Sequence, residues 1–150
     1  MSADLKDLYQ QVIVDHSKRP RNFHPLDGAS RKVEGFNPLC GDKVTIYVKI
    51  ENGLVADISF EGSGCAISTA SASLLTESLK GKTLADAEAL FESFHNLVTG
   101  LEPAEEAPKL GKLKVFSGVC DYPTRVKCAT LAWHTLHAAL IGDGGKVSTE

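Results

Sequence analysis

The side chains of this protein that are best suited to chemistry are its cysteines and one aspartate beside the first of them. Cys40 and Asp42 flank a single glycine in the stretch 38–42, whereas Cys65 and Cys128 lie far downstream. Thiolates and carboxylates are ligands of zinc in proteins, and a thiolate is also the nucleophile of sulfur chemistry. These four side chains form one site only if the fold brings them together.

The stretch between the first two thiols has the pattern of a β-hairpin. Apolar and polar side chains alternate along residues 43–51 and again along 54–61, where Ala56 is among the residues predicted to face inward. An Asn-Gly dipeptide at 52–53 is typical of a two-residue hairpin turn. We therefore predict an antiparallel hairpin, with residues 31–36 as a third strand of the same sheet.

This hairpin places Cys40, Asp42 and Cys65 near one another. The first two precede its first strand, and Cys65 follows its second strand. Because an antiparallel pair returns the chain to the end at which it began, the entry and the exit of the hairpin lie at the same end of the sheet. Cys65 also stands at the start of a predicted helix, where the helix dipole and free backbone N–H groups favour a thiolate.

Helices are predicted wherever apolar side chains recur three and four residues apart. They cover residues 4–16, 66–79, 84–98 with Thr83 as the N-cap, and a last segment from Pro123 to about Leu140. In the first helix we expect Leu8 on the buried face, and the serine- and alanine-rich second helix favours close packing against a neighbour. Cys128 falls in the first two turns of the last helix, one turn after Arg125, whose charge also favours a thiolate.

The order of these elements predicts an α+β fold, with a hairpin or three-stranded sheet followed by helices. We expect one domain over residues 1–142 and a disordered tail over 143–150. Between the third helix and the last helix, residues 99–112 predict a surface loop and residues 113–120 a short helix or turn.

Three thiolates and a carboxylate match the donors of a tetrahedral zinc site. The Cys-x-Asp spacing of Cys40 and Asp42 is tighter than the two to four residues that usually separate paired cysteine ligands. The alternative is that Asp42 only caps its own turn. The residues by themselves leave both interpretations open.

The composition excludes several classes of function. The chain has 150 residues, a net charge of −3 and 43% hydrophobic residues, which is ordinary for a globular protein and provides no basic surface for nucleic acid. No apolar run approaches the roughly 20 residues that cross a bilayer, and the first residues lack the features of a secretory signal. We expect a cytoplasmic protein, in which cysteines more often bind metal or handle sulfur than form disulfides.

The remaining candidate side chains have simpler interpretations. We expect Cys120 to be a partly buried free thiol. His16 and His24 flank a basic loop and are predicted to lie at the surface. His134 and His137 are predicted to face solvent, because their spacing turns them away from the helix face that carries the last cysteine ligand.

The segments that carry the cysteines resemble the iron–sulfur cluster assembly family of IscU and the NifU N-terminal domain. The resemblance spans roughly residues 5–141 and rests on LCGD at 39–42, GSGCAIS at 62–68, ASAS at 70–73, KGKT at 80–83 and RVKC at 125–128. Two features are similar to the SufU branch of this family. One is Lys127, where the IscU branch carries a histidine, and the other is the segment 99–120, which looks like the insertion of that branch.

The resemblance implies a three-stranded antiparallel sheet packed against helices, the SufE/NifU-like sandwich. It implies that Cys40, Asp42, Cys65 and Cys128 bind zinc or, alternatively, an iron–sulfur cluster. It also implies that Cys40 accepts persulfide sulfur from a SufS-type cysteine desulfurase, while Arg125 has a supporting electrostatic role. Downstream iron–sulfur assembly proteins are the further partners that it implies.

Three functions fit these residues and the resemblance. The first is a zinc-dependent sulfurtransferase that serves iron–sulfur cluster biogenesis. The second is a scaffold that assembles a 2Fe–2S cluster on the same thiols, since thiolates bind such clusters as well as zinc. The third is a structural zinc module that binds a protein partner. Lys127 favours the first over the second because a charged lysine is a poor ligand, and the size of the predicted core disfavours the third.

Overall fold

The computed structural model describes residues 3–38, 41–100, 111–140 and 145–148. Its elements follow in the order α1 (Ala3–Lys18), β1 (Arg31–Asn37), β2 (Asp42–Glu51), β3 (Leu54–Ser63), α2 (Ala66–Leu79), α3 (Leu84–Thr99), the 3₁₀ helix η1 (Gly111–Asp121), α4 (Pro123–Leu140) and β4 (Gly145–Ser148). This order confirms the predicted α+β fold. Most of the loop predicted over 99–112 lies outside the described residues.

The sheet has the strand order β3-β2-β1-β4, and β1, β2 and β3 pair antiparallel as predicted. In place of the disordered tail expected over 143–150, residues 145–148 form β4, which pairs parallel with Val33–Phe36 of β1. Residues 143, 144, 149 and 150 lie outside the described part of the chain. Without β4, the outer edge of β1 would present unpaired N–H and C=O groups. The additional strand forms because it pairs with these groups.

The β2–β3 hairpin turns through Asn52 and Gly53, whose φ angles of 53° and 75° are the left-handed values of a type I′ turn. The register shifts directly after Lys49, so that Ala56 is an additional residue on β3. The prediction that Ala56 faces inward is therefore wrong: Ala56 is exposed, and Val55 is buried in its place.

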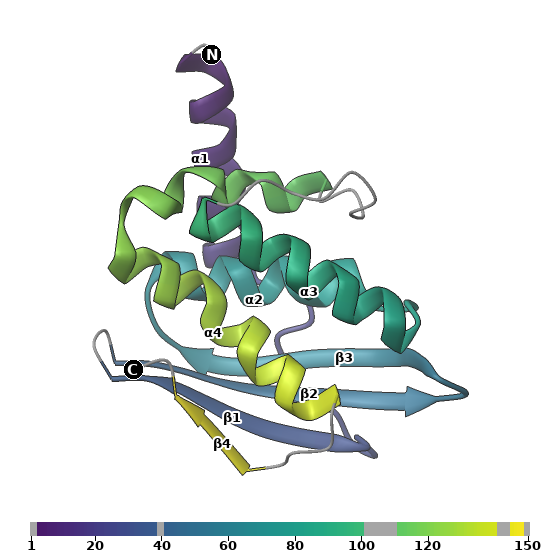
Figure 1. Ribbon diagram of the computed structural model, residues 1–150. Coiled ribbons are helices and arrows are strands. Elements are labelled where there is room, and N and C mark those ends of the chain that lie inside the picture. Colours follow the sequence, from purple (N-terminus) through teal and green to yellow (C-terminus); the bar gives the residue numbers. More distant parts are fainter. Residues whose placement is uncertain (1–2, 39–40, 101–110, 141–144, 149–150) are drawn as a thin grey trace.

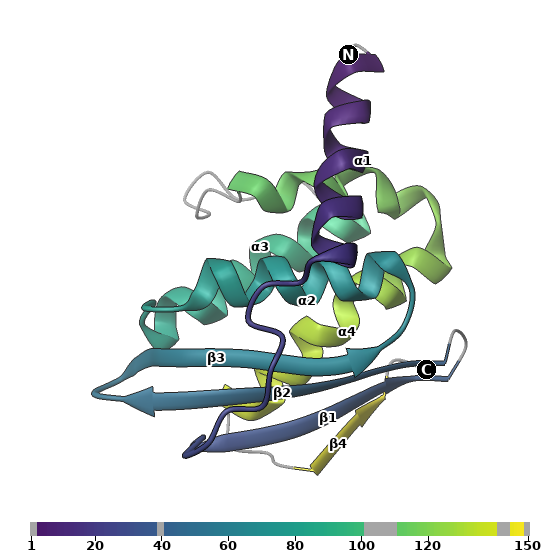
Figure 2. The same ribbon diagram turned by 180° about the vertical axis from the view of Figure 1, so that it is seen from behind.

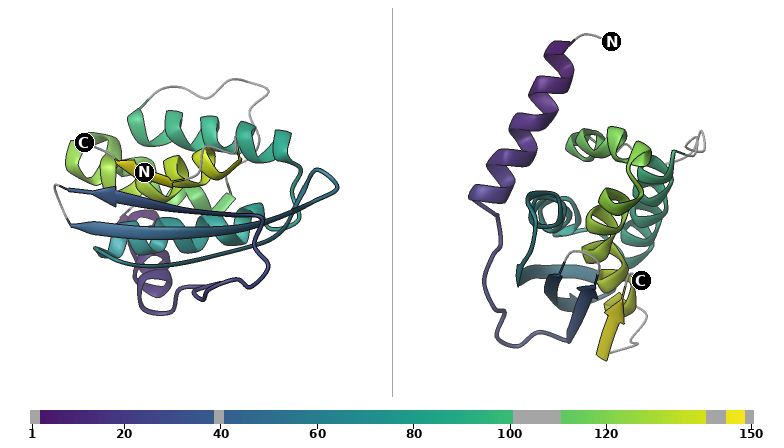
Figure 3. Two further views of the ribbon diagram at one scale, coloured as in Figure 1. Left: turned by 90° about the horizontal axis from the view of Figure 1, so that it is seen from below. Right: turned by 90° about the vertical axis from the view of Figure 1, so that its left-hand side faces the viewer.

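The helices lie on one face of the sheet, as Figures 1 and 3 show. α4 packs on β1 and β2, α2 packs on β3, and α3 and η1 pack against α4 farther from the sheet. Between these layers Trp133 stacks on Phe94, with ring centroids 4.5 Å apart. Within the part of the chain that is described, no helix is both long and apolar enough to cross a membrane.

Small side chains allow α4 to approach its neighbours closely, as predicted for the serine- and alanine-rich segment. A Cβ atom added at Gly35 of β1 would lie 2.0 Å from the Thr135 hydroxyl oxygen. On α2, Ser71 donates a hydrogen bond to the carbonyl oxygen of Ala129 and accepts one from the indole N–H of Trp133 at 3.1 Å. These contacts hold α4 firmly against both the sheet and α2.

The first helix is only partly packed on the rest of the protein. Its C-terminal half contacts α2, whereas its N-terminal half extends beyond the other helices (Figures 1 and 2). Leu8 is accordingly 53% exposed, so its predicted place on a buried face is wrong. After α1 the chain descends to β1 on the side seen in Figure 2. Within this segment, Phe23 packs edge-on against Phe60 of β3.

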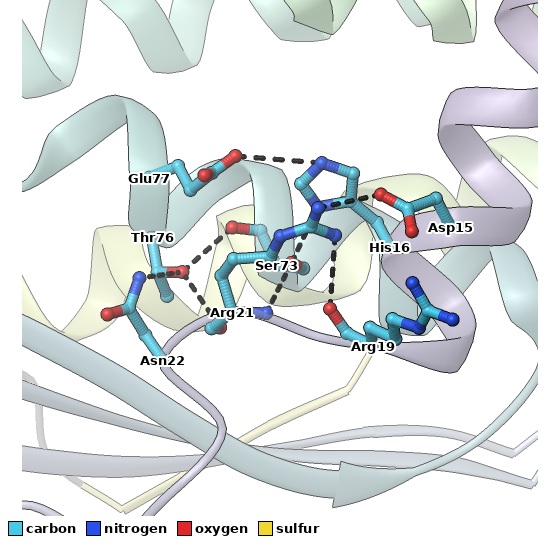
Figure 4. A network of polar contacts seen from close by, with 8 residues as sticks. All are labelled: Asp15, His16, Arg19, Arg21, Asn22, Ser73, Thr76 and Glu77. Carbon is cyan, nitrogen blue, oxygen red and sulfur yellow. Dashed lines mark hydrogen bonds and ion pairs between the residues drawn. The ribbon is translucent and has the colours of Figure 1, made fainter.

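His16 is buried, although the sequence was interpreted as placing it at the surface. It lies three residues after Ile13 and so continues the apolar face of α1. Figure 4 shows its ring between two side chains of α2. Nδ1 is 2.7 Å from the Ser73 hydroxyl oxygen, which also accepts the backbone N–H of Arg21, and Nε2 is 3.6 Å from a carboxylate oxygen of Glu77. This network fastens the end of α1 to α2.

We predict that the metal-free protein loses stability as the pH falls from 7.5 to 5.5. Burial, followed by the positive charge of Arg21, lowers the pKa of His16 below its ordinary value of 6.5. The unfolded chain therefore takes up this proton first, and the free energy of unfolding decreases once the pH falls below about 6.5.

Urea denaturation at the two pH values tests this prediction. The variant His16→Gln should show a smaller decrease in unfolding free energy than the native chain, because it lacks the group that titrates. An equal decrease in both proteins would contradict it. His24, which is exposed, supplies the matched control variant His24→Gln, and we expect that variant to behave as the native protein does.

Candidate metal centre

Five ends of secondary structure meet at one end of the sheet, on the left in Figure 1: the end of β1, the start of β2, the end of β3 and the starts of α2 and α4. Asp42, Cys65 and Cys128 come from these ends, and their ligand atoms all lie within 4.8 Å of one another. Among the residues described, no other group of three or more Cys, His, Asp or Glu side chains is gathered in this way. Cys40 lies outside the described residues.

Asp42 is the first residue of β2 and is completely buried. Its Oδ1 accepts the backbone N–H of Cys65 at 2.9 Å, so the carboxylate reaches across to the end of β3. Its Oδ2 lies 3.9 Å from the sulfur of Cys65. One oxygen is thus held by the backbone, and the other is presented to the thiols. Asp42 therefore does more than cap its own turn, because it also binds the backbone that follows β3.

Gly64 makes room for this carboxylate. A Cβ atom at Gly64 would lie 2.5 Å from Oδ1 of Asp42, well inside van der Waals contact. Position 64 therefore requires glycine, because the side chain of Asp42 approaches its backbone closely.

Cys65 is the N-cap residue of α2, as its position in the sequence predicts. Its sulfur accepts a hydrogen bond from the backbone N–H of Ser68 at 3.4 Å, and its side chain is exposed. The positive end of the helix dipole favours negative charge at this place. Cys65 is consequently the described thiol that is open to an approaching molecule.

Cys128 lies in the second turn of α4 and is 3% exposed. The side-chain nitrogen of Asn37 lies 3.7 Å from its sulfur and 3.4 Å from Oδ2 of Asp42. Asn37 is itself fully buried. We did not predict its role from the sequence, although one signal was present: Asn37 continues the inward-facing alternation of Val33 and Gly35, and a polar residue at such a position requires hydrogen-bond partners.

Arg125 lies one turn before Cys128 on α4, and its guanidinium group is 4.5 Å from the ring centroid of Tyr122. Both side chains are exposed. A cation held over an aromatic ring is restrained in position. The supporting electrostatic role of Arg125 stays a prediction, and so does metal ligation by the full set of four residues.

The histidines lie elsewhere. His24 is exposed as predicted. His134 and His137 do not simply face solvent, because both are half-buried against the ring of Phe91 on α3. Burial, together with the neighbouring histidines, lowers the pKa of His134. The side chain of Cys120 lies outside the described set.

The donor atoms fit a zinc ion in kind and in spacing. Zinc bonds to sulfur at about 2.3 Å and to carboxylate oxygen at about 2.0–2.2 Å, so the ligand atoms of one ion stand roughly 4 Å apart. The 3.9 Å between the Cys65 sulfur and the Asp42 oxygen agrees with this spacing. Soft thiolates together with one hard carboxylate also suit iron.

The family assignment follows from comparison with known proteins. A family model described as the NifU-like N-terminal domain matches residues 8–129. The chain belongs to this family. The match includes both Asp42 and Cys128, so the whole candidate metal centre lies within the NifU-like domain.

Relatives within this group have names that concern iron–sulfur cluster assembly. The zinc-dependent sulfurtransferase SufU of Bacillus subtilis is 40% identical over 96% of this chain and 97% of its own. The iron–sulfur cluster assembly scaffold protein IscU of Streptococcus pyogenes is 43% identical over 92% of this chain and 86% of its own.

Solved structures have the same fold. A protein of Fervidobacterium islandicum, named as an iron–sulfur cluster assembly scaffold protein for the SUF system, superposes with a TM-score of 0.82 at 37% identity and covers 93% of this chain and 99% of its own. A NifU-like N-terminal structure from Brucella abortus, at 24% identity and a TM-score of 0.81, covers 93% and 97% respectively. The latter supports the fold alone.

We predict that Gly64→Ala lowers the free energy of unfolding of the metal-free protein by about 1–3 kcal/mol. The added methyl group would displace Oδ1 of Asp42 from the Cys65 N–H and leave a buried carboxylate without this hydrogen bond. Urea denaturation measures the difference. Ser63→Ala, a change at an exposed neighbouring residue, is the matched control and should cost much less. Equal stabilities of Gly64→Ala and the native chain would contradict the prediction.

Proposed function

We propose that this protein, an iron–sulfur cluster assembly protein of the IscU/SufU type, is a zinc-dependent sulfurtransferase. It would accept persulfide sulfur from a SufS-type cysteine desulfurase and deliver it for cluster biogenesis. The observation that carries the proposal is the mixed donor set, in which Asp42, Cys65 and Cys128 gather at one end of the sheet. The likeness to the Bacillus SufU over nearly its full length supports the same function.

In this proposal Cys40, Asp42, Cys65 and Cys128 hold the zinc ion. A bound zinc ion keeps thiols deprotonated and therefore ready to react. The residues differ in how firmly the protein holds them: Cys65 caps α2, and Cys128 is buried within α4. The sequence alone predicts a turn at Cys40, and a ligand in a turn is expected to exchange at less cost than one fixed in a helix. We therefore assign the acceptor role to Cys40.

The sulfur transfer balances without an additional oxidant or reductant. The thiolate of Cys40 attacks the outer sulfur of the desulfurase persulfide. A new S–S bond forms on Cys40, the S–S bond of the desulfurase breaks, and its cysteine leaves as a thiolate. Arg125 stabilises negative charge at the exposed rim of the site during this exchange. The product is a persulfide on Cys40, which downstream assembly proteins would consume.

Lys127 separates this function from that of a scaffold for a 2Fe–2S cluster. Lys127 precedes Cys128, where the IscU branch carries a histidine, and it is half-buried. An ammonium group has no lone pair for a metal, so it adds no ligand to a cluster. The scaffold function remains the second candidate because the Streptococcus relative is named as a scaffold. A purely structural zinc module is disfavoured, because the protein has a large apolar core apart from the site. A reducing cytoplasm would keep the thiols free for these reactions.

Purification with metal analysis, followed by a desulfurase assay with cysteine as substrate, tests the proposal. We expect about one zinc ion per chain and a cysteine-dependent increase in desulfurase turnover. Cys40→Ala should return turnover to that of the desulfurase alone, because the acceptor thiol is absent. Cys120→Ala is the matched control and should retain the increase. No stimulation by the native protein would overturn the sulfurtransferase function, and a brown protein that keeps its colour through purification would support the scaffold.

A further inference from the structure

The backbone of Asn37 forms the base of the connection between β1 and β2. Asn37 is the last residue of β1, and its register partner is Asp42, the first residue of β2. Its carbonyl oxygen accepts the N–H of Gly41 at 2.9 Å, and Gly41 has a left-handed φ of 72°. Strand pairing and this turn hydrogen bond together fix the backbone position from which the side chain of Asn37 extends.

The side chain of Asn37 points into the candidate metal centre. It is fully buried, and its nitrogen lies 3.4 Å from Oδ2 of Asp42 and 3.7 Å from the sulfur of Cys128. A carboxamide nitrogen carries two hydrogens, so it can donate one to each of these atoms. The opposite orientation of the amide would place its oxygen against a carboxylate and a sulfur, and would repel both. The N–H groups therefore face the donors.

These two hydrogen bonds connect parts of the protein that are distant in sequence. Asp42 belongs to β2 and Cys128 to α4, and Asn37 bridges them from β1. Oδ1 of Asp42 is already held by the N–H of Cys65. With Asn37 on Oδ2, both oxygens of the carboxylate are restrained, and the buried sulfur of Cys128 is restrained by the same amide group.

We propose that Asn37 is a positioning residue that keeps Asp42 and Cys128 in place as metal ligands. The inference rests on the proposed function, because it concerns the ligands of that site. Partners that orient metal ligands through hydrogen bonds change metal affinity by about 10–100-fold when they are removed. By restraining these two ligands, Asn37 slows the release of the ion.

The experiment compares native protein with Asn37→Asp in two measurements: the rate of zinc transfer to a chelator and the absorption spectrum after substitution with Co²⁺. Aspartate has the shape of asparagine but replaces the N–H donors with a second acceptor beside the carboxylate and the sulfur. We expect zinc release at least about tenfold faster, together with weaker or shifted thiolate-to-Co²⁺ charge-transfer bands. Asn96→Asp, which adds the same charge on α3 far along the chain, is the control and should match the native protein.

Native rates and native spectra in Asn37→Asp would overturn the inference. If that variant does not fold, as circular dichroism would show, Asn37→Ala decides by the same criteria, because it removes both donors without adding charge. A lower melting temperature of the metal-free variant with an unchanged Co²⁺ spectrum would mean a structural role and would also overturn it. A native protein that binds neither zinc nor Co²⁺ through thiolates would instead overturn the proposed function itself, and the inference with it.

Discussion

The buried carboxylate of Asp42 is the group around which this end of the molecule is built. A charged group withdrawn from water is tolerated only when hydrogen bonds or counter-charges replace its hydration. Here the N–H of Cys65 and the amide of Asn37 approach its two oxygens, and Gly64 has no side chain that would block the approach. The end of β1, the start of β2 and the start of α2 are consequently held in one arrangement by a single side chain.

The same arrangement places the two described thiols in different surroundings. Cys65 belongs to a helix cap and Cys128 to a helix packed on the sheet, so the positions of both sulfurs are determined by rigid elements. Cys65 is exposed, whereas Cys128 is buried. Of these two thiols, Cys65 is therefore the one that an approaching partner molecule can reach.

The position of Cys128 depends on contacts made far from the site. The approach of α4 to β1 requires the glycine at position 35, and the approach of α4 to α2 requires the small side chain of Ser71. Trp133 fills the interior beside these contacts by stacking on Phe94. Larger residues at the two small positions would move the whole helix, and the thiol with it. The candidate metal centre therefore depends on core packing as much as on its own side chains.

The sequence alone determined the elements whose signals are local. Alternation and the Asn-Gly turn predicted the β2–β3 hairpin, and the topology of a hairpin then placed Asp42 beside Cys65. It did not determine the additional residue Ala56 in the bulge, the burial of His16 or the fourth strand, since each depends on which surface packs against it. Only the tertiary structure brought Asn37 to Cys128, across 91 residues. That contact requires one particular placement of α4 against the strands of the sheet. The packing of the whole core determines this placement, and no local sequence pattern does.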